Sequence, residues 1–274
     1  MKEFLTRTVS GILYAAILVV SMYWSNALLM VLFVFGLIAL AEFKKLIKLK
    51  SLIVPAIIFS ILYFGIWYWC RIHHSATGTN EAIQILLVIT IFVNLFLIKD
   101  LFAEKKIPLF GSKRYIATTF YLASGFIFIL LIANYSNTFT PLLLLGSFIL
   151  VWVNDSFAYL TGKNFGRQKL FPSVSPKKTV EGFLGGLFFA CVSSYFIATY
   201  TETLGFTNWL ILAIIISVFG TLGDLIESKF KRQAEVKDSG VIMPGHGGLL
   251  DRLDSIIFAA PFIYLFLRIL TYVS

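Results

Sequence analysis

The sequence predicts an all-α polytopic membrane protein, and three observations carry this prediction. Of the 274 residues, 58% are hydrophobic and only 14% are charged, and the mean hydropathy is +0.87. Apolar runs of roughly 17 to 22 residues recur along the chain and are long enough for helices to cross a bilayer. The runs are continuous rather than alternating, which argues against a β-barrel. We therefore expect about nine transmembrane helices.

The expected helices follow one another with short connections. They span residues 9–24, 26–41, 52–70, 82–98, 115–133, 141–161, 182–200, 207–226 and 255–272. A tight turn at Trp24-Ser25-Asn26 joins the first two, so these two helices are either short, tilted or re-entrant. The sequence leaves open whether both of them span the membrane.

Basic residues predict the orientation of the helices. If the N-terminus is cytoplasmic, 21 of the 23 Lys and Arg lie on the inner face, and only Arg71 and Arg268 lie outside. We therefore expect an external C-terminus, a multi-pass protein of the inner (plasma) membrane and a site that faces the cytoplasm. The net charge of +9 then reflects topology and attraction to anionic membrane lipids, and no nucleic acid is expected as a partner. The two cysteines, Cys70 and Cys191, make neither a disulfide framework nor a metal-binding spacing.

Unusual polar residues are concentrated in the second half of the chain. Residues 1–140 are expected to form a transmembrane scaffold of apolar helices with short basic loops. Residues 141–274 carry nearly all of the polar clusters, and these lie near the predicted cytoplasmic face. Because ionisable groups are costly in hydrocarbon, we expect this half to be the catalytic region.

The first two polar clusters combine an acid with basic and hydroxyl side chains. Asp155 lies near the inner end of an expected helix with Tyr159 one turn on, and it needs a cation, a donor or a helix-packing hydrogen bond. The second cluster precedes the helix at 182–200, where free backbone N–H groups and lysines suit a phosphate. A basic loop with a capped helix is the alternative. The candidate phosphate-binding residues there are Ser175, Lys177, Lys178 and Thr179.

Two further clusters supply carboxylates. Asp224, Glu227 and Ser228 are spaced to share one helical face, and hard oxygen ligands of this kind suit Mg²⁺. Asp251 and Asp254 share a face at the start of the last helix, where acids also suit the helix dipole. Carboxylates at several helix ends beside many basic residues are typical of nucleotide phosphates held through a divalent metal.

A glycine-rich segment with one histidine precedes these last acids. His246 lies between Gly245 and the pair Gly247-Gly248, and it is either a donor to a phosphate or a loop-ordering residue. A single histidine does not make a metal site of its own. The glycines allow backbone to lie close to a ligand.

These motifs resemble those of the phosphatidate cytidylyltransferase (CDP-diacylglycerol synthase) family. The similarity rests on Ser228-x-Phe-Lys-Arg, four residues, Lys237-Asp238-x-Gly240, and then Pro-Gly-His-Gly-Gly-x-x-Asp251-Arg252-x-Asp254. Ser175-Pro-Lys-Lys-Thr-x-Glu-Gly182 and Asp155-x-x-Ala-Tyr159 also resemble that family, and Met243 is a conservative departure from it. The resemblance covers roughly residues 150–274, and such a long polar motif is specific.

The resemblance implies a reaction in which CTP and phosphatidic acid from the inner leaflet give CDP-diacylglycerol and pyrophosphate. It implies Mg²⁺ on Asp224 and Asp251, with Glu227, Ser228 or Asp254 nearby, and a K⁺ ion beside the magnesium. The residues expected to hold or position the substrates are Asp155, Lys177, Lys178, Ser228, Lys231, Arg232, Lys237, Asp238, His246, Gly247, Gly248 and Arg252, together with Ser175 and Thr179.

Two other functions and one assembly stay open at this point. A CTP-dependent polyprenol or dolichol kinase shares parts of such motifs but would release CDP, and the full glycine–histidine run argues against it. A transporter would place acids at the membrane midplane and show internal symmetry, and neither is evident here. The glycine face formed by Gly182, Gly185 and Gly186 packs either within one chain or between the two chains of a homodimer.

Overall fold

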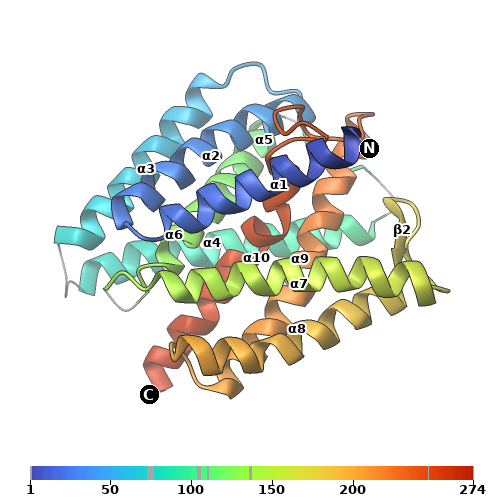
Figure 1. Ribbon diagram of the computed structural model, residues 1–274. Helices are drawn as coiled ribbons and strands as arrows, with labels where there is room; N and C mark the ends of the chain where they lie inside the picture. The colour runs from blue at the N-terminus through green and yellow to red at the C-terminus, as the bar shows by residue number, and fades with distance from the viewer. Residues whose placement is uncertain are drawn as a thin grey trace.

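A computed structural model describes residues 2–72, 77–103, 106–109, 111–135, 138–245 and 247–273, and it shows a bundle of long helices with one small sheet (Figure 1). The elements in chain order are α1 (Lys2–Ser21), α2 (Ser25–Leu46), α3 (Ile53–Ile72), α4 (Thr77–Phe102), α5 (Ser112–Ile116), the π-helix η1 (Ala117–Ala123), α6 (Ser124–Ile132), α7 (Pro141–Phe165), β1 (Lys169–Phe171), β2 (Ser175–Thr179), α8 (Val180–Thr201), α9 (Phe206–Gln233) and α10 (Leu250–Val273). The prediction of an all-α polytopic membrane protein is confirmed.

Within the described ranges, seven helical segments are long and apolar enough to cross a membrane. Two shorter apolar segments, Thr8–Ser21 and Ile53–Trp69, belong to α1 and α3. The turn predicted at Trp24 does separate two helices, since α2 begins at Ser25 after Trp24 as its N-cap. Whether α1 and α3 also span the membrane stays a prediction.

The helices extend further than predicted at their polar ends. Helix α9 continues to Gln233 rather than ending at 226, and α10 begins at Leu250 rather than at 255. Hydropathy marks where apolar side chains end, whereas the backbone hydrogen bonds of a helix continue into polar sequence. As a result, Glu227 and Lys231 belong to α9, and Asp251 and Asp254 belong to the first turns of α10.

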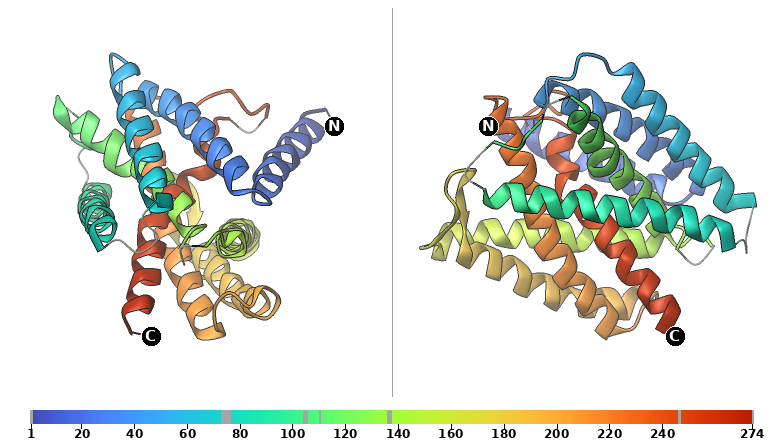
Figure 2. Two further views of the ribbon diagram at one scale, coloured as in Figure 1. Left: turned by 90° about the vertical axis from the view of Figure 1, so that its left-hand side faces the viewer. Right: turned by 180° about the vertical axis from the view of Figure 1, so that it is seen from behind.

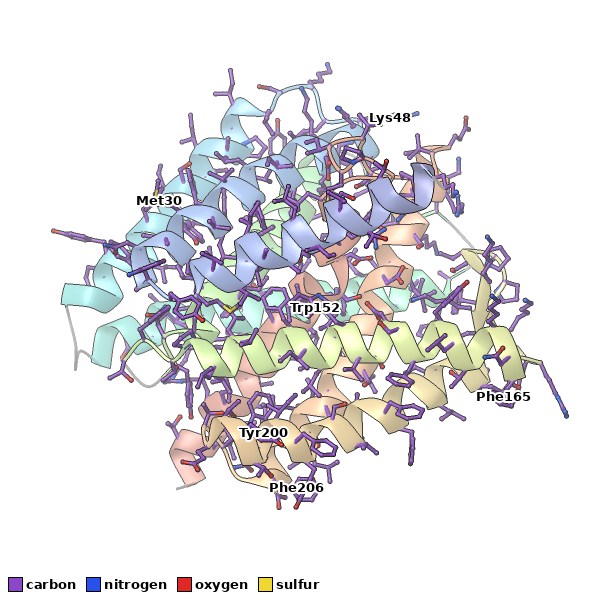
Figure 3. The ribbon with its side chains drawn as sticks, in the orientation of Figure 1. Met30, Lys48, Trp152, Phe165, Tyr200 and Phe206 are labelled. Carbon is purple, nitrogen blue, oxygen red and sulfur yellow. The ribbon has the colours of Figure 1, made fainter. Side chains whose placement is uncertain are left out.

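The two ends of the bundle differ in character. The N-terminus, the β1–β2 hairpin and the loop 234–249 lie at one end, and the C-terminus and the α8–α9 turn lie at the other (Figures 1 and 2). Lys48 and Phe165 are at the hairpin end, whereas Tyr200 and Phe206 are towards the opposite end (Figure 3). The hairpin and the loop after α9, which carry many of the polar motifs of the second half of the chain, therefore lie towards the same end.

Glycines allow the helices that carry these motifs to pack closely within one chain. A Cβ atom on Gly186 of α8 would lie 2.6 Å from the Asn154 carbonyl oxygen of α7, and one on Gly182 would lie 2.8 Å from the Ala158 carbonyl oxygen. A Cβ atom on Gly223 of α9 would lie 2.8 Å from the carbonyl oxygen of Asp254 in α10. The glycine face of α8 is thus used against α7, and it no longer supports a homodimer.

An aromatic cluster lies beneath the polar end. The ring centroid of Phe230 in α9 lies 5.2 Å from that of Phe43 in α2 and 5.9 Å from that of Tyr121 in η1. The ring centroid of Tyr121 lies 6.2 Å from that of Phe258 in α10. These rings join both halves of the chain around α9. The π-helix that carries Tyr121 was not predicted; such segments are common near functional sites.

Replacement of Gly186 by alanine should destabilise the α7–α8 pair. The added methyl group meets backbone, so we expect a loss of about 1 to 3 kcal/mol and a lower melting temperature of the purified protein in detergent. The matched control is Gly65→Ala in α3, where nothing lies within 4 Å and alanine should be neutral or stabilising. Equal melting temperatures for the two variants would contradict this packing.

Candidate active site

Three carboxylates from two helices form the centre of the polar end. One oxygen each of Asp224 and Glu227 in α9 and of Asp254 in α10 lies within 4.8 Å of the others. Glu227 is fully buried and Asp254 is 7% exposed, whereas Asp224 is more accessible. Buried like charges at such distances need compensation by cations or donors.

Two lysines provide part of that compensation. Lys178 of β2 lies with its Nζ 2.6 Å from Oδ2 of Asp224. Lys231 of α9 forms an ion pair with Glu227 and places its Nζ 2.7 Å from Oδ1 of Asp251, so it bridges α9 and α10. Burial alone would lower the pKa of Lys178, but the Asp224 carboxylate outweighs that effect and raises this pKa above its ordinary value. Lys178 is therefore a cation at neutral pH and not a base.

The described residues still carry more acids than cations here. Asp155 of α7 accepts a hydrogen bond from Asn154 Nδ2 at 3.3 Å, and its charge interacts with those of Asp224 and Lys178. Oε1 of Glu227 has no hydrogen-bond partner among the residues that the structure describes. Unpartnered, buried carboxylate oxygen and an excess of negative charge fit a divalent cation, because hard cations prefer oxygen ligands.

Asp251 faces the glycine-rich loop rather than the group of three acids. Its Oδ2 accepts hydrogen bonds from the Ser239 backbone N–H at 2.9 Å, the Ser239 hydroxyl at 3.0 Å and the Gly248 N–H at 2.7 Å. Together with Lys231 on Oδ1, these donors fix Ser239 and Gly248 against the start of α10. Asp251 is therefore not one of the three acids whose oxygens lie within 4.8 Å of one another, but Lys231 links it to Glu227.

Glu42 of α2 holds the same loop from the other side. Glu42 is only 2% exposed, and its carboxylate accepts hydrogen bonds from the N–H groups of Leu249 at 3.1 Å and Leu250 at 2.8 Å. The Ser239 hydroxyl lies 3.3 Å from Oε2 of Glu42 and shares its one proton between this oxygen and Asp251. An acid at a helix N-terminus satisfies free N–H groups and interacts favourably with the helix dipole. Glu42 therefore fixes the start of α10, where Asp251 and Asp254 lie.

The carboxylates of Glu42 and Asp251 leave no room for a side chain at three glycines of the motif. A Cβ atom on Gly248 would lie 2.6 Å from Oε2 of Glu42, and Gly240 packs against the same side chain. Gly247 has a φ of +87°, which favours glycine, and a Cβ there would lie 2.7 Å from Oδ2 of Asp251. The backbone at these glycines thus lies close to two carboxylates of the protein itself, and the close approach to a ligand stays a prediction.

The remaining predicted site residues lie around this centre. Ser228 donates a hydrogen bond to Oδ1 of Asp224 at 3.2 Å, and Arg232 donates to the Val174 carbonyl at 3.3 Å. The Thr179 hydroxyl accepts from the Gly182 N–H at 3.1 Å and is the N-cap of α8. Ser175 is half-buried, and His246 lies outside the described residues. The exposed residues among the predicted set include Lys177, Lys237, Asp238 and Arg252. Their roles stay predictions.

Two features of this end were not predicted from the sequence. Glu42 lies just past the expected helix at 26–41 and beside Lys44 and Lys45, so it resembles a solvated boundary residue. A carboxylate directly after a long apolar run is the signal that could have identified it. Lys229 was assigned to the basic inner face, yet it is buried and donates to the carbonyls of Asp100 and Ala103 at the end of α4.

The fold and this site define a polytopic membrane enzyme with an acidic, lysine-rich centre at one end, and comparisons with known proteins identify its family. Residues 5–270 match the cytidylyltransferase family. The chain is 33% identical to the phosphatidate cytidylyltransferase of Bacillus subtilis (strain 168), over 98% of this chain and 99% of that protein. It is also 33% identical to the phosphatidate cytidylyltransferase of Staphylococcus haemolyticus, over 96% and 97% of the two chains. Over 126 residues, 45% of this chain and 48% of the relative, it is 47% identical to the phosphatidate cytidylyltransferase of Staphylococcus aureus (strain COL). The chain belongs to the cytidylyltransferase family and is a nucleotidyltransferase, as the motifs predicted.

Replacement of Glu42 by glutamine should loosen the loop 239–250. The side-chain NH₂ group of the glutamine would face the backbone N–H groups that the Glu42 carboxylate accepts, so two donors would meet. A buried donor without an acceptor lowers the free energy of unfolding by about 1 to 3 kcal/mol. We expect faster hydrogen exchange at the amides of Leu249 and Leu250, measured by mass spectrometry. Glu81→Gln, an exposed position on α4, is the control. Unchanged protection at both amides would show that Glu42 does not hold the loop.

Proposed function

We propose that the protein transfers the cytidylyl group of CTP to phosphatidic acid and releases pyrophosphate, forming CDP-diacylglycerol for phospholipid biosynthesis. The observation that carries this proposal is the carboxylate group Asp224, Glu227 and Asp254 beside Lys178 at one end of an apolar bundle. The two full-length relatives are phosphatidate cytidylyltransferases, which supports these substrates. A polar site walled by apolar helices suits a reaction between a polar nucleotide and a membrane lipid.

A divalent ion fits the carboxylate group, and we assign it as Mg²⁺. Asp224, Glu227 and Asp254 would hold it. Asp251 is a further predicted ligand, and its oxygens accept hydrogen bonds from Lys231 and from the Gly248 N–H. An ion bound there would neutralise negative charge on the phosphates of CTP. Magnesium suits such a site because it is commonly bound by one or two carboxylates together with substrate phosphates and water.

The chain's own residues would position the substrates and balance their charges. A phosphate oxygen of the lipid forms a bond to the α-phosphorus of CTP, while the bond from that phosphorus to the bridging oxygen of pyrophosphate breaks. The lipid phosphate is already anionic, so no general base is required. Lys178 stays charged and, with Lys177 on the same strand, would orient the phosphates and offset their growing charge.

The site should face the cytoplasm, from which CTP arrives, while the lipid enters from the inner leaflet of the plasma membrane. Support comes from basic residues at the hairpin end, including Lys48 (Figure 3) and Lys177 of β2, since such residues favour the cytoplasmic side. A K⁺ ion beside the magnesium, as the resemblance implies, is tested by adding or omitting potassium in the assay below.

Asp224→Asn should abolish turnover because it removes the partner of Lys178 and one ligand of the metal. The assay follows labelled CTP and phosphatidic acid with the purified protein, and it identifies both the lipid product and the released group. We expect CDP-lipid and pyrophosphate, lost on chelation and restored by Mg²⁺. Glu202→Gln, exposed at the other end of the bundle, should keep full activity. Release of CDP with phosphorylation of a polyprenol or dolichol would instead identify a lipid kinase.

Asp254→Asn should raise the Mg²⁺ concentration needed for half-maximal activity at least about ten-fold, as loss of a charged ligand costs more than 1.4 kcal/mol. A magnesium titration of initial rates measures this. The same titration with Asp251→Asn separates its two roles. A higher magnesium requirement would make Asp251 a ligand, and a lower rate with an unchanged requirement would make it an anchor of the loop. An unchanged requirement in Asp254→Asn would remove Asp254 from the metal site.

A further inference from the structure

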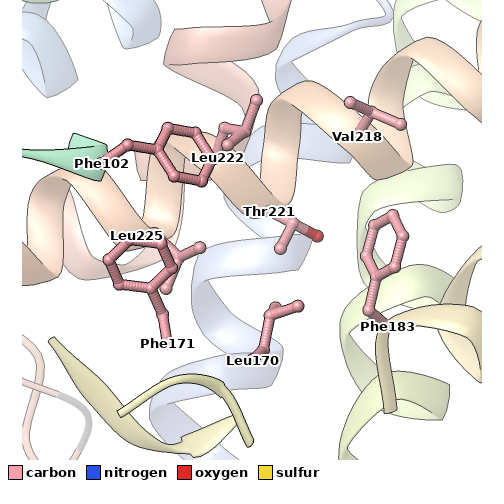
Figure 4. Close-up of a pocket in the computed structure, with 8 residues that line it drawn as sticks. All are labelled: Phe102, Leu170, Phe171, Phe183, Val218, Thr221, Leu222 and Leu225. Atoms are coloured by element: carbon pink, nitrogen blue, oxygen red, sulfur yellow. The ribbon is translucent and has the colours of Figure 1, made fainter. Parts of the chain in front are cut away.

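An apolar pocket of about 360 Å³ lies beside the carboxylate group, on another face of α9. Helix α9 lines it with Val218, Thr221, Leu222 and Leu225. Its other walls come from Phe102 at the end of α4, from β1 and from Phe183 in the first turn of α8 (Figure 4). Among the described residues that line it, Thr221 alone is polar. The volume lies within the range of small-molecule sites, which is about 300 to 1,000 Å³.

The pocket and the charged site share the same structural elements. Leu225 follows Asp224 directly in α9, so one helix carries a pocket wall and a carboxylate on neighbouring faces. The hairpin does the same, because Phe171 of β1 pairs with Ser175 of β2, and β2 carries Lys178. An apolar cavity and a cation that contacts the acidic group are thus held together by a two-stranded sheet and one helix.

The pocket lies at the surface of the bundle rather than in its interior. Phe102 is 65% exposed, and its ring packs against that of Phe171 at 5.5 Å, edge to face. On α8, Leu184 and Phe188 are 53% and 61% exposed. Both belong to a helix long and apolar enough to cross a membrane, where exposed apolar side chains suit contact with lipid. An apolar molecule could therefore reach the pocket sideways from the bilayer at the level of the charged site.

We propose that this pocket holds the part of an acyl chain next to the glycerol of the lipid substrate. The proposal rests on the proposed function, since it takes phosphatidic acid as the substrate. A lipid with an anionic head and an apolar tail matches a basic hairpin on one side and an apolar cavity on the other. CTP, which is polar throughout, does not match this cavity.

Val218→Phe, which fills the pocket, tests this inference by kinetics. We expect the KM for dipalmitoyl phosphatidic acid to rise at least about ten-fold, because one badly fitting apolar group has effects of this size. The KM for dioctanoyl phosphatidic acid should rise as well, because the proximal part of its chains would occupy the same pocket, whereas the KM for CTP should change much less. The matched control is Val192→Phe, on α8, where the side chain is 42% exposed. Equal KM values for the long-chain lipid in both variants would overturn the inference, whereas a wild-type protein without turnover would overturn the proposed function itself.

Photo-cross-linking of the wild-type protein provides a test that does not depend on a variant folding. Phosphatidic acid with a diazirine near the acyl carbonyl should label β1 or residues 218–225 of α9, as mapped by mass spectrometry. Labelling confined to other segments would overturn the inference. Equal labelling of these residues by phosphatidylcholine with the same chain would also overturn it, because the pocket would then hold bulk lipid.

Discussion

The cost of burying several carboxylates in an apolar bundle organises the hairpin end of this protein. Glu42, Glu227 and Asp254 are each almost fully buried, and Asp251 and Asp224 lie close to them. Carboxylates in such surroundings persist when donors or cations meet them. Two solutions are visible here. Glu42 and Asp251 are met by backbone N–H groups, a serine and Lys231, whereas Glu227 keeps an oxygen without a partner among the described residues.

These two solutions correspond to two tasks. Glu42 and Asp251 accept hydrogen bonds from the backbone beside the glycines, so these two carboxylates have a structural role. The carboxylates that are only partly met keep oxygen free for a ligand, and the described lysines do not balance their charge. The same residue type therefore serves as an anchor in Glu42 and as a candidate ligand in Glu227, and the difference lies in the number of donors within reach.

Sequence reasoning predicted the class of fold and the end of the bundle that carries the site, because both follow from where apolar runs stop and charges gather. It also placed Asp224, Glu227 and Ser228 on one face of a helix, since helical spacing is local. It did not separate Asp251 from Asp254, which share a helix but contact different partners. Nor did it find Glu42, because the contact with Leu250 joins residues 208 positions apart. Contacts of this range depend on tertiary packing that periodicity does not encode.

The division into an N-terminal scaffold and a C-terminal catalytic region describes where the motifs lie, but the two parts are not independent. The Ser10 hydroxyl of α1 donates to the Pro244 carbonyl of the motif loop, and Glu42 of α2 fixes the start of α10. Lys229 of α9 joins the end of α4, whose Phe102 forms a wall of the apolar pocket. Helix α9 thus connects the scaffold, the carboxylates and the pocket. A change in the packing of α9 would therefore alter the charged site and the pocket together.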